Sequence, residues 1–248
     1  MNKLSVSVVV PVYNGHQYLD EQLESILCQL SILDELIIIN DASTDNSQKI
    51  IEPYINRPNV KFFENELNLG LTSTINRGLR IASGDIIVFA DQDDVWLPDR
   101  LSVIRFEHLV ADCVVVDALI CDESLEVIFD SYFNFINFTL DPIKMLMRCR
   151  VLGCCMSFRR SLVHNVIIPK WCWHDHFLIL FFRLRGVKIN AVHKPLVKYR
   201  RHKSALSSAG KPSTVMYKFF GVFGNRLFLL MSIMLIFIMR KLVRDIIK

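Results

Sequence analysis

The stretch Ile86-Ile87-Val88-Phe89-Ala90-Asp91-Gln92-Asp93-Asp94 joins an apolar, strand-like run directly to a cluster of carboxylates. Alternate residues of an extended chain share one face, so Asp91 and Asp93 can converge on a cation beyond the strand end while Asp94 turns away. Mg²⁺ and Mn²⁺ prefer oxygen ligands, and Mg²⁺ leaves coordination positions for phosphate and water. The pattern predicts a site for a metal ion and a diphosphate. The alternative is an acidic loop that caps a helix starting near Pro98.

The chain before this stretch alternates strand and helix patterns. Apolar runs stopped by turn formers predict strands at residues 5–10, 35–39 and 60–63. Amphipathic segments predict helices at residues 17–30, from a cap at Ser43 or Thr44 to Ile51, and at residues 72–82. Such alternation implies an α/β fold with a mostly parallel sheet and helices on both faces. Ligands bind beyond the carboxyl ends of such strands, which is where Asn14, Asp41 and residues 91–94 fall.

The second half of the chain has weaker patterns. Strands are predicted at residues 114–116 and 127–129, and helices at residues 142–149 and from about His176 to Gly186. The aromatic segment Phe133 to Phe138 can either border an acceptor site or pack in the core, and core packing is favoured.

Four motifs follow one another along the chain: V-S-V-V-V-P-V-Y-N-G at 6–15, D-E-L-I-I-I-N-D-A-S-T-D-N-S at 34–47, N-x-G-L-x-x-x-x-N-x-G at 68–78 and A-S-G-D-I-I-V-F-A-D-Q-D-D-V-W at 82–96. In this order they resemble the family 2 glycosyltransferases of GT-A fold. The D-Q-D-D-V-W form, with His174-Asp175-His176-Phe177 and Tyr199-Arg200-Arg201-His202, is most similar to the bacterial rhamnosyltransferase branch. The resemblance covers residues 4 to 205, which we take as the catalytic domain 1–205.

The resemblance implies a pocket for the donor nucleotide. In it Asp41 accepts hydrogen bonds from the base or ribose, and Asp91 lies near the ribose and the metal. The floor of the pocket is formed by Pro11, Tyr13 and Asn14. A local turn or cap is the other role open to Asp41, and a loop aspartate can fill both.

The resemblance also assigns the metal. Asp93, with Asp91, would hold Mg²⁺ or Mn²⁺ against the diphosphate, where the cation neutralises charge on the departing nucleoside diphosphate. Arg201 and His202 are candidates for contact with the same diphosphate or metal. The alternative for these two residues is a solvated basic segment.

Asp175 is the candidate general base. Inverting transfer needs a carboxylate opposite the leaving group, and the resemblance places the family's base at this residue. The alternative is that Asp175 caps the helix that follows it. His174 and His176 are expected to be structural or to position substrate, because no zinc-like Cys or His spacing is present. Phe177 stands where the branch commonly has Trp, which leaves the acceptor preference open.

Composition sets the surroundings of the domain. Hydrophobic residues make up 52% of the 248 residues, enough for one core. Seven Cys without a regular framework, and an N-terminus without a signal-peptide pattern, predict a cytoplasmic protein. The net charge of +4 is modest and forms no stripe suited to nucleic acid.

Residues 206–248 are predicted to be a flexible loop followed by an apolar, basic helical tail. Residues Leu227 to Met239 carry no charge, but a helix of that length covers only about 20 Å of a hydrocarbon core of about 30 Å. An interfacial helix on the inner face of the cytoplasmic membrane is favoured, with Arg240, Lys241, Arg244 and Lys248 meeting anionic head groups. Packing on the catalytic domain, or on a second copy in a homodimer, is the alternative.

The expected function is inverting, metal-dependent transfer of a sugar, rhamnose from dTDP-rhamnose, onto a bacterial surface glycan. The donor could also be another dTDP- or UDP-sugar, and the acceptor a saccharide or a lipid-linked saccharide. A sugar-phosphate nucleotidyltransferase should carry a basic, Gly-rich phosphate loop, which Pro11 to Gly15 lacks. A non-catalytic sugar-binding protein of this fold should have lost Asp93 or Asp175, and both are present.

Overall fold

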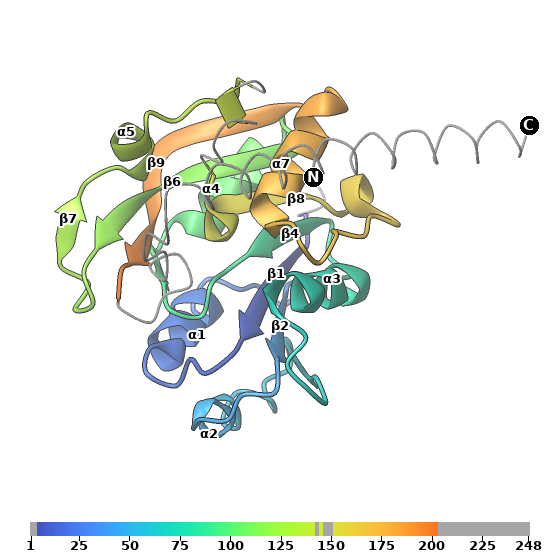
Figure 1. Cartoon of the computed structure of the whole chain (residues 1–248), viewed down its shortest axis with the longest axis vertical. Coiled ribbons are helices and arrows are strands. Elements are labelled where there is room, and N and C mark those ends of the chain that lie inside the picture. Colours follow the sequence, from blue (N-terminus) through green and yellow to red (C-terminus); the bar gives the residue numbers. More distant parts are fainter. Residues whose placement is uncertain (1–3, 142–143, 146–150, 203–248) are drawn as a thin grey trace, which may run out of the picture.

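A mixed β-sheet frames the part of the chain that this computed structural model describes, residues 4–141, 144–145 and 151–202. Its strands are β1 (Val6–Val12), β2 (Glu35–Asn40), β3 (Val60–Glu64), β4 (Ile86–Phe89), β5 (Val95–Trp96), β6 (Cys113–Cys121), β7 (Val127–Phe129), β8 (Met156–Arg159) and β9 (Ile189–Arg200). Their order is β3-β2-β1-β4-β8-β6-β9-β5, with β7 paired to β6 (Figure 1). Strands β3, β2, β1 and β4 are parallel, whereas β8 is antiparallel to β4 and β6. The predicted α/β fold is confirmed.

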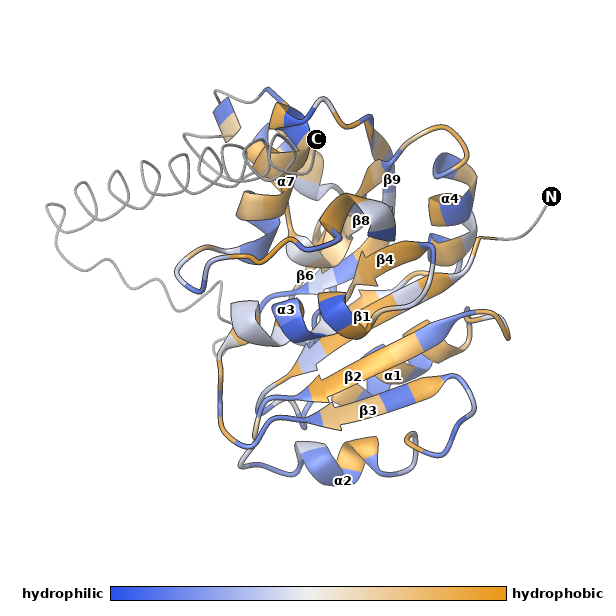
Figure 2. Cartoon of the chain, turned by 90° about the vertical axis from the view of Figure 1, so that its right-hand side faces the viewer, coloured by the Kyte–Doolittle hydropathy of each residue, from blue (hydrophilic) through white to orange (hydrophobic). Residues whose placement is uncertain are grey.

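Helices cover both faces of the parallel half, which is why β1, β2 and β4 are mostly apolar and are buried along their whole length. In Figure 2, α3 (Leu71–Ile81) lies in front of β1 and β2, while α1 (Leu19–Leu27) lies behind them. The short helix α2 (Ser47–Ile51) follows β2. Gly78 allows α3 to approach the sheet, because a Cβ there would lie 2.4 Å from a methyl carbon of Val9. The glycine that ends the third motif is therefore a packing contact.

The second half of the chain extends the sheet and returns to the acidic loop. Its helices are α4 (Arg100–Glu107), α5 (Tyr132–Ile136) and α7 (His174–Leu184), with 3-10 turns at Gly153–Cys155 and Arg160–Val163. Strand β9 runs parallel to β6 and antiparallel to β5. Since β5 directly follows residues 91–94, β9 brings the last described residues back beside that loop.

Most elements lie where the sequence predicts them, with three differences. Helix α2 begins at Ser47, so neither Ser43 nor Thr44 caps it. Helix α7 begins at His174, earlier than expected. Strands β5 and β9 and helix α5 were not predicted; β9 is only partly buried and changes register near Pro195, which breaks any simple alternation. The aromatic segment divides, because Phe133 is buried and stacks on Phe138 at 3.9 Å, while Phe135 is 47% exposed.

Several predictions fall on residues outside the described part. They are most of the helix at 142–149, the flexible loop after residue 203 and the C-terminal tail. Within the described residues, none of the helices combines the length and the apolar content that crossing a membrane would require.

Candidate active site

The loops that follow β1 and β2 are bound to each other at the carboxyl edge of the sheet. Asn14 takes a left-handed backbone conformation, with φ of 51°. Its side-chain oxygen accepts a hydrogen bond from the Thr44 N–H at 2.8 Å, and its own N–H donates to Ser43 Oγ at 3.0 Å. Ser43 and Thr44 therefore bind the loop that follows β1, whereas the sequence predicted that one of them caps α2. Beside them Pro11 is buried and Tyr13 is 45% exposed.

Asp41 is a buried organiser of this edge. Its Oδ1 accepts hydrogen bonds from Asn65 Nδ2 at 2.6 Å and from the Leu69 N–H at 2.9 Å. Its Oδ2 accepts one from the N–H of Gly70 at 2.9 Å, and Gly70 has a left-handed φ of 82° just before α3. The side-chain hydrogen bonds of Asp41 described here reach residues 24 to 29 positions away instead of forming a local turn or cap, and its role toward a nucleotide stays a prediction.

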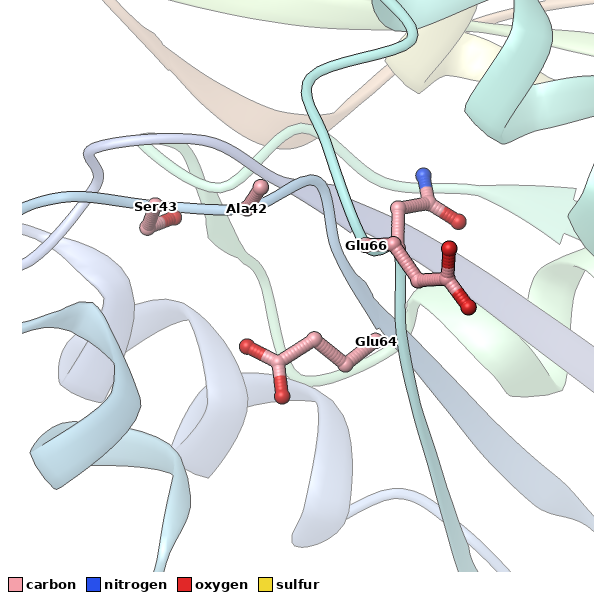
Figure 3. Close-up of a pocket in the computed structure, with 5 residues that line it drawn as sticks. Ala42, Ser43, Glu64 and Glu66 are labelled. Carbon is pink, nitrogen blue, oxygen red and sulfur yellow. The ribbon is translucent and has the colours of Figure 1, made fainter.

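An open cavity of about 380 Å³ lies beside Asp41, at the ends of β2 and β3. Figure 3 shows the carboxylates of Glu64 and Glu66 around it, below and beside the loop that carries Ala42 and Ser43. Two carboxylates would repel a diphosphate, so this cavity suits an uncharged, hydrogen-bonding part of a ligand.

The acidic loop lies at the end of β4, and there one prediction is wrong. Asp94 was expected to turn away, but it is fully buried and points inward. Ligand-type atoms of Asp91, Asp94 and Cys154 all lie within 4.8 Å of one another. The backbone N–H of Arg200 donates to Asp94 Oδ1 at 3.0 Å, which explains the inward turn, while Asp94 Oδ2 has no hydrogen-bond partner among the described residues.

The loop concentrates negative charge where solvation is poor. Burial, reinforced by the charges of Asp93 and Asp175, raises the pKa of Asp91 to about 7. Burial and Asp93 also raise the pKa of Asp94 well above its usual range. Carboxylates in this state gain stability from a divalent cation, so Asp91 and Asp94 fit such an ion. The charge of Asp93 acts on both, but its Oδ2 lies 2.8 Å from His202 Nε2 and is not one of the clustered ligand atoms, so its role as a metal ligand stays a prediction. Cys154 fits the cation poorly, because a hydrogen bond with Cys155 and burial raise the pKa of its thiol, and hard cations prefer oxygen.

A buried guanidinium lies beneath the acidic loop. Arg100 is fully buried, and its charge centre lies 4.2 Å over the ring of Trp96. It donates to the backbone oxygens of Phe89, at 3.4 Å, and Cys154. Burial lowers the pKa of Arg100, and the carboxylates of Asp91 and Asp94 oppose that shift. This cation is a fixed counter-charge below the site.

The side chains of two glutamines connect the acidic loop to neighbouring segments by hydrogen bonds. The side-chain amide of Gln92 forms a double hydrogen bond with the backbone of Tyr13: its Nε2 donates to the carbonyl at 3.0 Å, and its Oε1 accepts from the N–H at 2.9 Å. Gln22 Nε2, from α1, donates to the Asp91 carbonyl at 2.6 Å. The sequence reasoning missed both residues. The position of Gln92 within the D-Q-D-D motif was the feature of the sequence that could have indicated its role.

The Y-R-R-H segment also differs from expectation in which arginine reaches the loop. Arg201 is exposed, and its backbone N–H donates to the carbonyl of Cys121 at 2.9 Å. Arg200 is buried, donates through Nε to the Asp93 carbonyl at 2.9 Å, and pairs with Glu21. His202 Nε2 lies 2.8 Å from Asp93 Oδ2. The segment therefore reaches the acidic loop through Arg200 and His202.

Tyr18 of α1 joins these contacts into one cluster. The Arg200 guanidinium lies 4.4 Å over its ring, and the His202 ring centre is 4.8 Å away. The Tyr18 hydroxyl donates to Glu123 at 2.7 Å, and with burial this contact raises the pKa of Tyr18 to about 12. Tyr18 is therefore a protonated donor at neutral pH.

Asp175 lies in the first turn of α7, on the same edge. The helix N-cap is Trp173, and Asp175 Oδ1 accepts only from the adjacent His176 N–H at 2.6 Å, so the capping alternative is wrong. His174 packs edge-on against Phe89 at 5.3 Å, which fixes the start of α7 over the end of β4. Burial lowers the pKa of His174, so it stays neutral. Asp175 is close enough for its charge to act on Asp91.

Comparisons with known proteins agree with this geometry. The family model Glycosyl transferase family 2 matches residues 7–167. A UDP-Glc:alpha-D-GlcNAc-diphosphoundecaprenol beta-1,3-glucosyltransferase of Escherichia coli is 32% identical, covering 84% of this chain and 81% of that protein. A dTDP-rhamnosyl transferase of Shigella flexneri is 25% identical, covering 86% and 78%.

A solved structure supports the fold. TarS residues 1–349 of S. aureus, in complex with UDP-GlcNAc, has a TM-score of 0.69 and 22% identity, covering 88% of this chain and 64% of that one. Other curated relatives are longer: the chain spans 65% of one from Nostoc and 63% of one from Bacillus subtilis. Since the family model covers well over half of the chain, the chain belongs to glycosyltransferase family 2.

Proposed function

We propose that the chain catalyses inverting transfer of a sugar from a nucleotide-sugar donor to a saccharide or lipid-linked saccharide of a bacterial surface glycan. The observation that carries this proposal is the placement of Asp175 within electrostatic reach of the acidic loop that includes Asp91 and Asp93. A base on one side and a cation-binding loop on the other are the two groups that such a transfer needs.

The charges of the site suggest how the donor lies. The nucleobase of the donor fits the cavity beside Asp41, next to Pro11, Tyr13 and Asn14. The carboxylates of Glu64 and Glu66 disfavour phosphate there. The diphosphate of the donor fits the acidic loop only with Mg²⁺ or Mn²⁺ bound by Asp91 and Asp93, with Asp94 beneath. When bound, the cation would neutralise the charge of the leaving diphosphate. His202, and Arg201 if its exposed side chain turns inward, would contact the same group.

The proposed chemistry balances in one displacement. Asp175 takes the proton of the acceptor hydroxyl, the hydroxyl oxygen forms a bond to the anomeric carbon, and the bond from that carbon to the diphosphate oxygen breaks. The nucleoside diphosphate leaves with the electron pair, and the anomeric centre inverts because attack and departure occur on opposite faces.

Two donors are candidates. The D-Q-D-D-V-W form and the Shigella relative, named as a dTDP-rhamnosyl transferase, favour dTDP-rhamnose. The Escherichia coli relative, named for UDP-Glc, favours UDP-glucose as the second candidate.

A thermal-shift screen with Mn²⁺ tests the proposal, because a ligand that binds the folded state raises the melting temperature. We expect dTDP-rhamnose to stabilise the protein more than UDP-glucose, and stabilisation to vanish with EDTA. Release of dTDP or UDP is then measured for the stabilising donor. Nucleoside triphosphate with sugar 1-phosphate is the control: release of pyrophosphate from that pair, without donor turnover, would instead show a nucleotidyltransferase.

The sequence of the C-terminal tail supports association of the protein with the inner face of the cytoplasmic membrane. Its apolar stretch from Leu227 to Met239 is followed by basic residues, and a lipid-linked acceptor would require membrane contact in any case. Fractionation of the full chain and of a version ending at residue 214 tests this. Loss of membrane association on truncation supports the proposal. A full chain that stays in the soluble fraction, and forms a dimer that truncation dissolves, supports the homodimer instead.

A further inference from the structure

We propose that the indole rings of Trp171 and Trp173 form a stacking platform for a pyranose ring of the acceptor, beside Asp175. The two side chains are 46% and 59% exposed, whereas Trp96 is 3% exposed. Tryptophan is highly buried on average, so two exposed indoles within three residues are unusual. This inference rests on the proposed function, because it identifies the acceptor side of the same reaction.

The exposure of the indoles is built into the segment. Cys172, between them, is buried, and its carbonyl accepts a hydrogen bond from Thr72 Oγ1 at 2.8 Å. Its N–H donates to the Pro169 carbonyl at 2.9 Å. Trp173 has an extended backbone, with φ of −67° and ψ of 128°. The turn at Pro169–Cys172 and the buried Cys172 thus hold the backbone between the two tryptophans, while both indoles stay exposed.

The same contacts place the indoles at the active edge of the sheet. Asn76 exchanges two hydrogen bonds with the backbone of Ile168, at 2.7 and 2.9 Å, one turn further along α3 than Thr72. The segment 168–172 therefore runs along α3 toward its start at Gly70, where the Gly70 N–H binds Asp41. It then enters α7, which begins against Phe89 at the end of β4. The backbone that carries the two indoles thus runs from α3 to the end of β4, the strand that the acidic loop follows.

The chemistry of this position selects a neutral sugar. A pyranose presents a face of C–H groups that packs against the electron-rich face of an aromatic ring, while its hydroxyls stay free to reach Asp175. An anionic ligand would meet the carboxylates of Asp91, Asp93 and Asp175 without a counter-ion of its own. A nucleobase already has a hydrogen-bonding cavity beside Asp41. An acceptor saccharide is the ligand that remains.

Saturation-transfer NMR with the full chain, diamagnetic Mg²⁺ and dTDP tests the platform. The probes are the methyl glycosides of glucose, N-acetylglucosamine, galactose, mannose and rhamnose, with irradiation of the aromatic protons. We expect transfer to ring C–H protons of at least one glycoside. Its affinity should fall by about tenfold in Trp173→Ala, the loss of one aromatic contact, and less in Trp173→Phe, which keeps a ring. The matched control is Phe106→Ala, since Phe106 is an aromatic residue that is 68% exposed on α4.

The outcomes separate the platform from the proposed function. A wild type that shows no transfer to any glycoside, or a Trp171→Ala/Trp173→Ala protein that binds glycoside as the wild type does, would overturn the platform. So would a loss of donor affinity in Trp173→Ala as large as the loss of glycoside affinity, because the indole would then belong to the donor site. Failure of the wild type to bind any nucleotide sugar in the thermal-shift screen would count against the proposed function instead.

Discussion

The imidazole Nε2 of His202 lies 2.8 Å from Oδ2 of Asp93, a contact between residues 109 positions apart. Both side chains are largely buried, at 7% and 20% side-chain exposure. Arg200, two residues earlier, binds the carbonyl of Asp93 and the carboxylate of Asp94. The end of β9 therefore holds the acidic loop from two sides. It also places an imidazole at the carboxylate that is expected to bind the cation.

Replacing Asp93 by Asn should abolish turnover and weaken diphosphate binding, because one charge that faces the cation is lost. We expect Mn²⁺ and dTDP affinity, measured by calorimetry, to fall by about tenfold or more. His202→Gln is the matched variant: it removes the contact to Asp93 but keeps the carboxylate, so it should retain more Mn²⁺ affinity than Asp93→Asn. Near-normal, metal-dependent activity of Asp93→Asn would refute the assignment.

Replacing Asp175 by Asn should separate chemistry from binding. We expect kcat to fall by on the order of 10²-fold or more, the usual range for loss of a general base, with little change in donor affinity. His176→Asn is a useful comparison, because that side chain lies next to Asp175 but its Nε2 contacts the Met145 carbonyl at 2.9 Å. If Asp175→Asn lost donor binding in proportion to kcat, Asp175 would be a structural residue.

Replacing Arg200 by Met should destabilise the fold as well as the site. The change removes the side-chain hydrogen bonds from Arg200 to the carbonyls of Asp93 and Glu123 and its ion pair with Glu21, whereas the backbone N–H that binds Asp94 remains. Hydrogen bonds to a charged group contribute about 1.5–3 kcal/mol each. Its neighbour Arg201 is exposed, so Arg201→Met should change the free energy of unfolding by less than about 0.5 kcal/mol. Urea unfolding of the two variants compares them.

Arg200→Lys tests whether Arg200 acts through geometry. Lysine keeps the charge but cannot supply the planar fork that reaches Asp93, Glu123 and Glu21 together. We expect Arg200→Lys to recover most of the stability that Arg200→Met loses, while its Mn²⁺ affinity stays below that of the wild type. Equal recovery of both would show that charge alone matters here.

The parallel half of the sheet and the position of the site were predictable from the sequence because their causes are local. Apolar runs such as β1 and β4 are specified by their own residues, and the loops after parallel strands share one edge whatever the rest of the chain does. The acidic loop could be placed at that edge for the same reason, whereas Asp175, and the roles of both, came from the resemblance to a known family.

The orientation of side chains within the loop could not be predicted, because it depends on residues distant in sequence. Strand alternation predicted that Asp94 turns away from Asp91, but the loop is no longer a strand, and the Arg200 N–H draws Asp94 inward. Likewise, nothing in Y-R-R-H says which arginine is buried. The pairing of β9 with β6 decides which arginine is buried, and β9 itself has no clear sequence pattern.

The pH dependence of metal binding follows from the acidic loop. The pKa of Asp91 rises from 3.8 to about 7 on folding without metal, so this carboxyl is protonated in the folded chain between those values and ionised in the unfolded chain. Folding then takes up a proton, and the stability that the neutral carboxyl contributes is lost as pH rises from about 4 to 7. A cation must displace that proton, so we expect Mn²⁺ affinity to fall by about tenfold per pH unit below pH 7.

Mn²⁺ titrations between pH 5.5 and 8, with melting curves in EDTA, measure both effects. Buried His108 acts in the opposite direction on stability, since burial lowers its pKa to about 4 and stability rises with pH through that histidine's range. The informative quantity is therefore the difference between wild type and Asp91→Asn, which shares His108 and lacks the titrating carboxyl. We expect the metal-free wild type to lose melting temperature relative to Asp91→Asn as pH rises toward 7, and Mn²⁺ to reverse that loss in the wild type alone. A difference that does not change with pH would mean that Asp91 is already ionised in the metal-free fold.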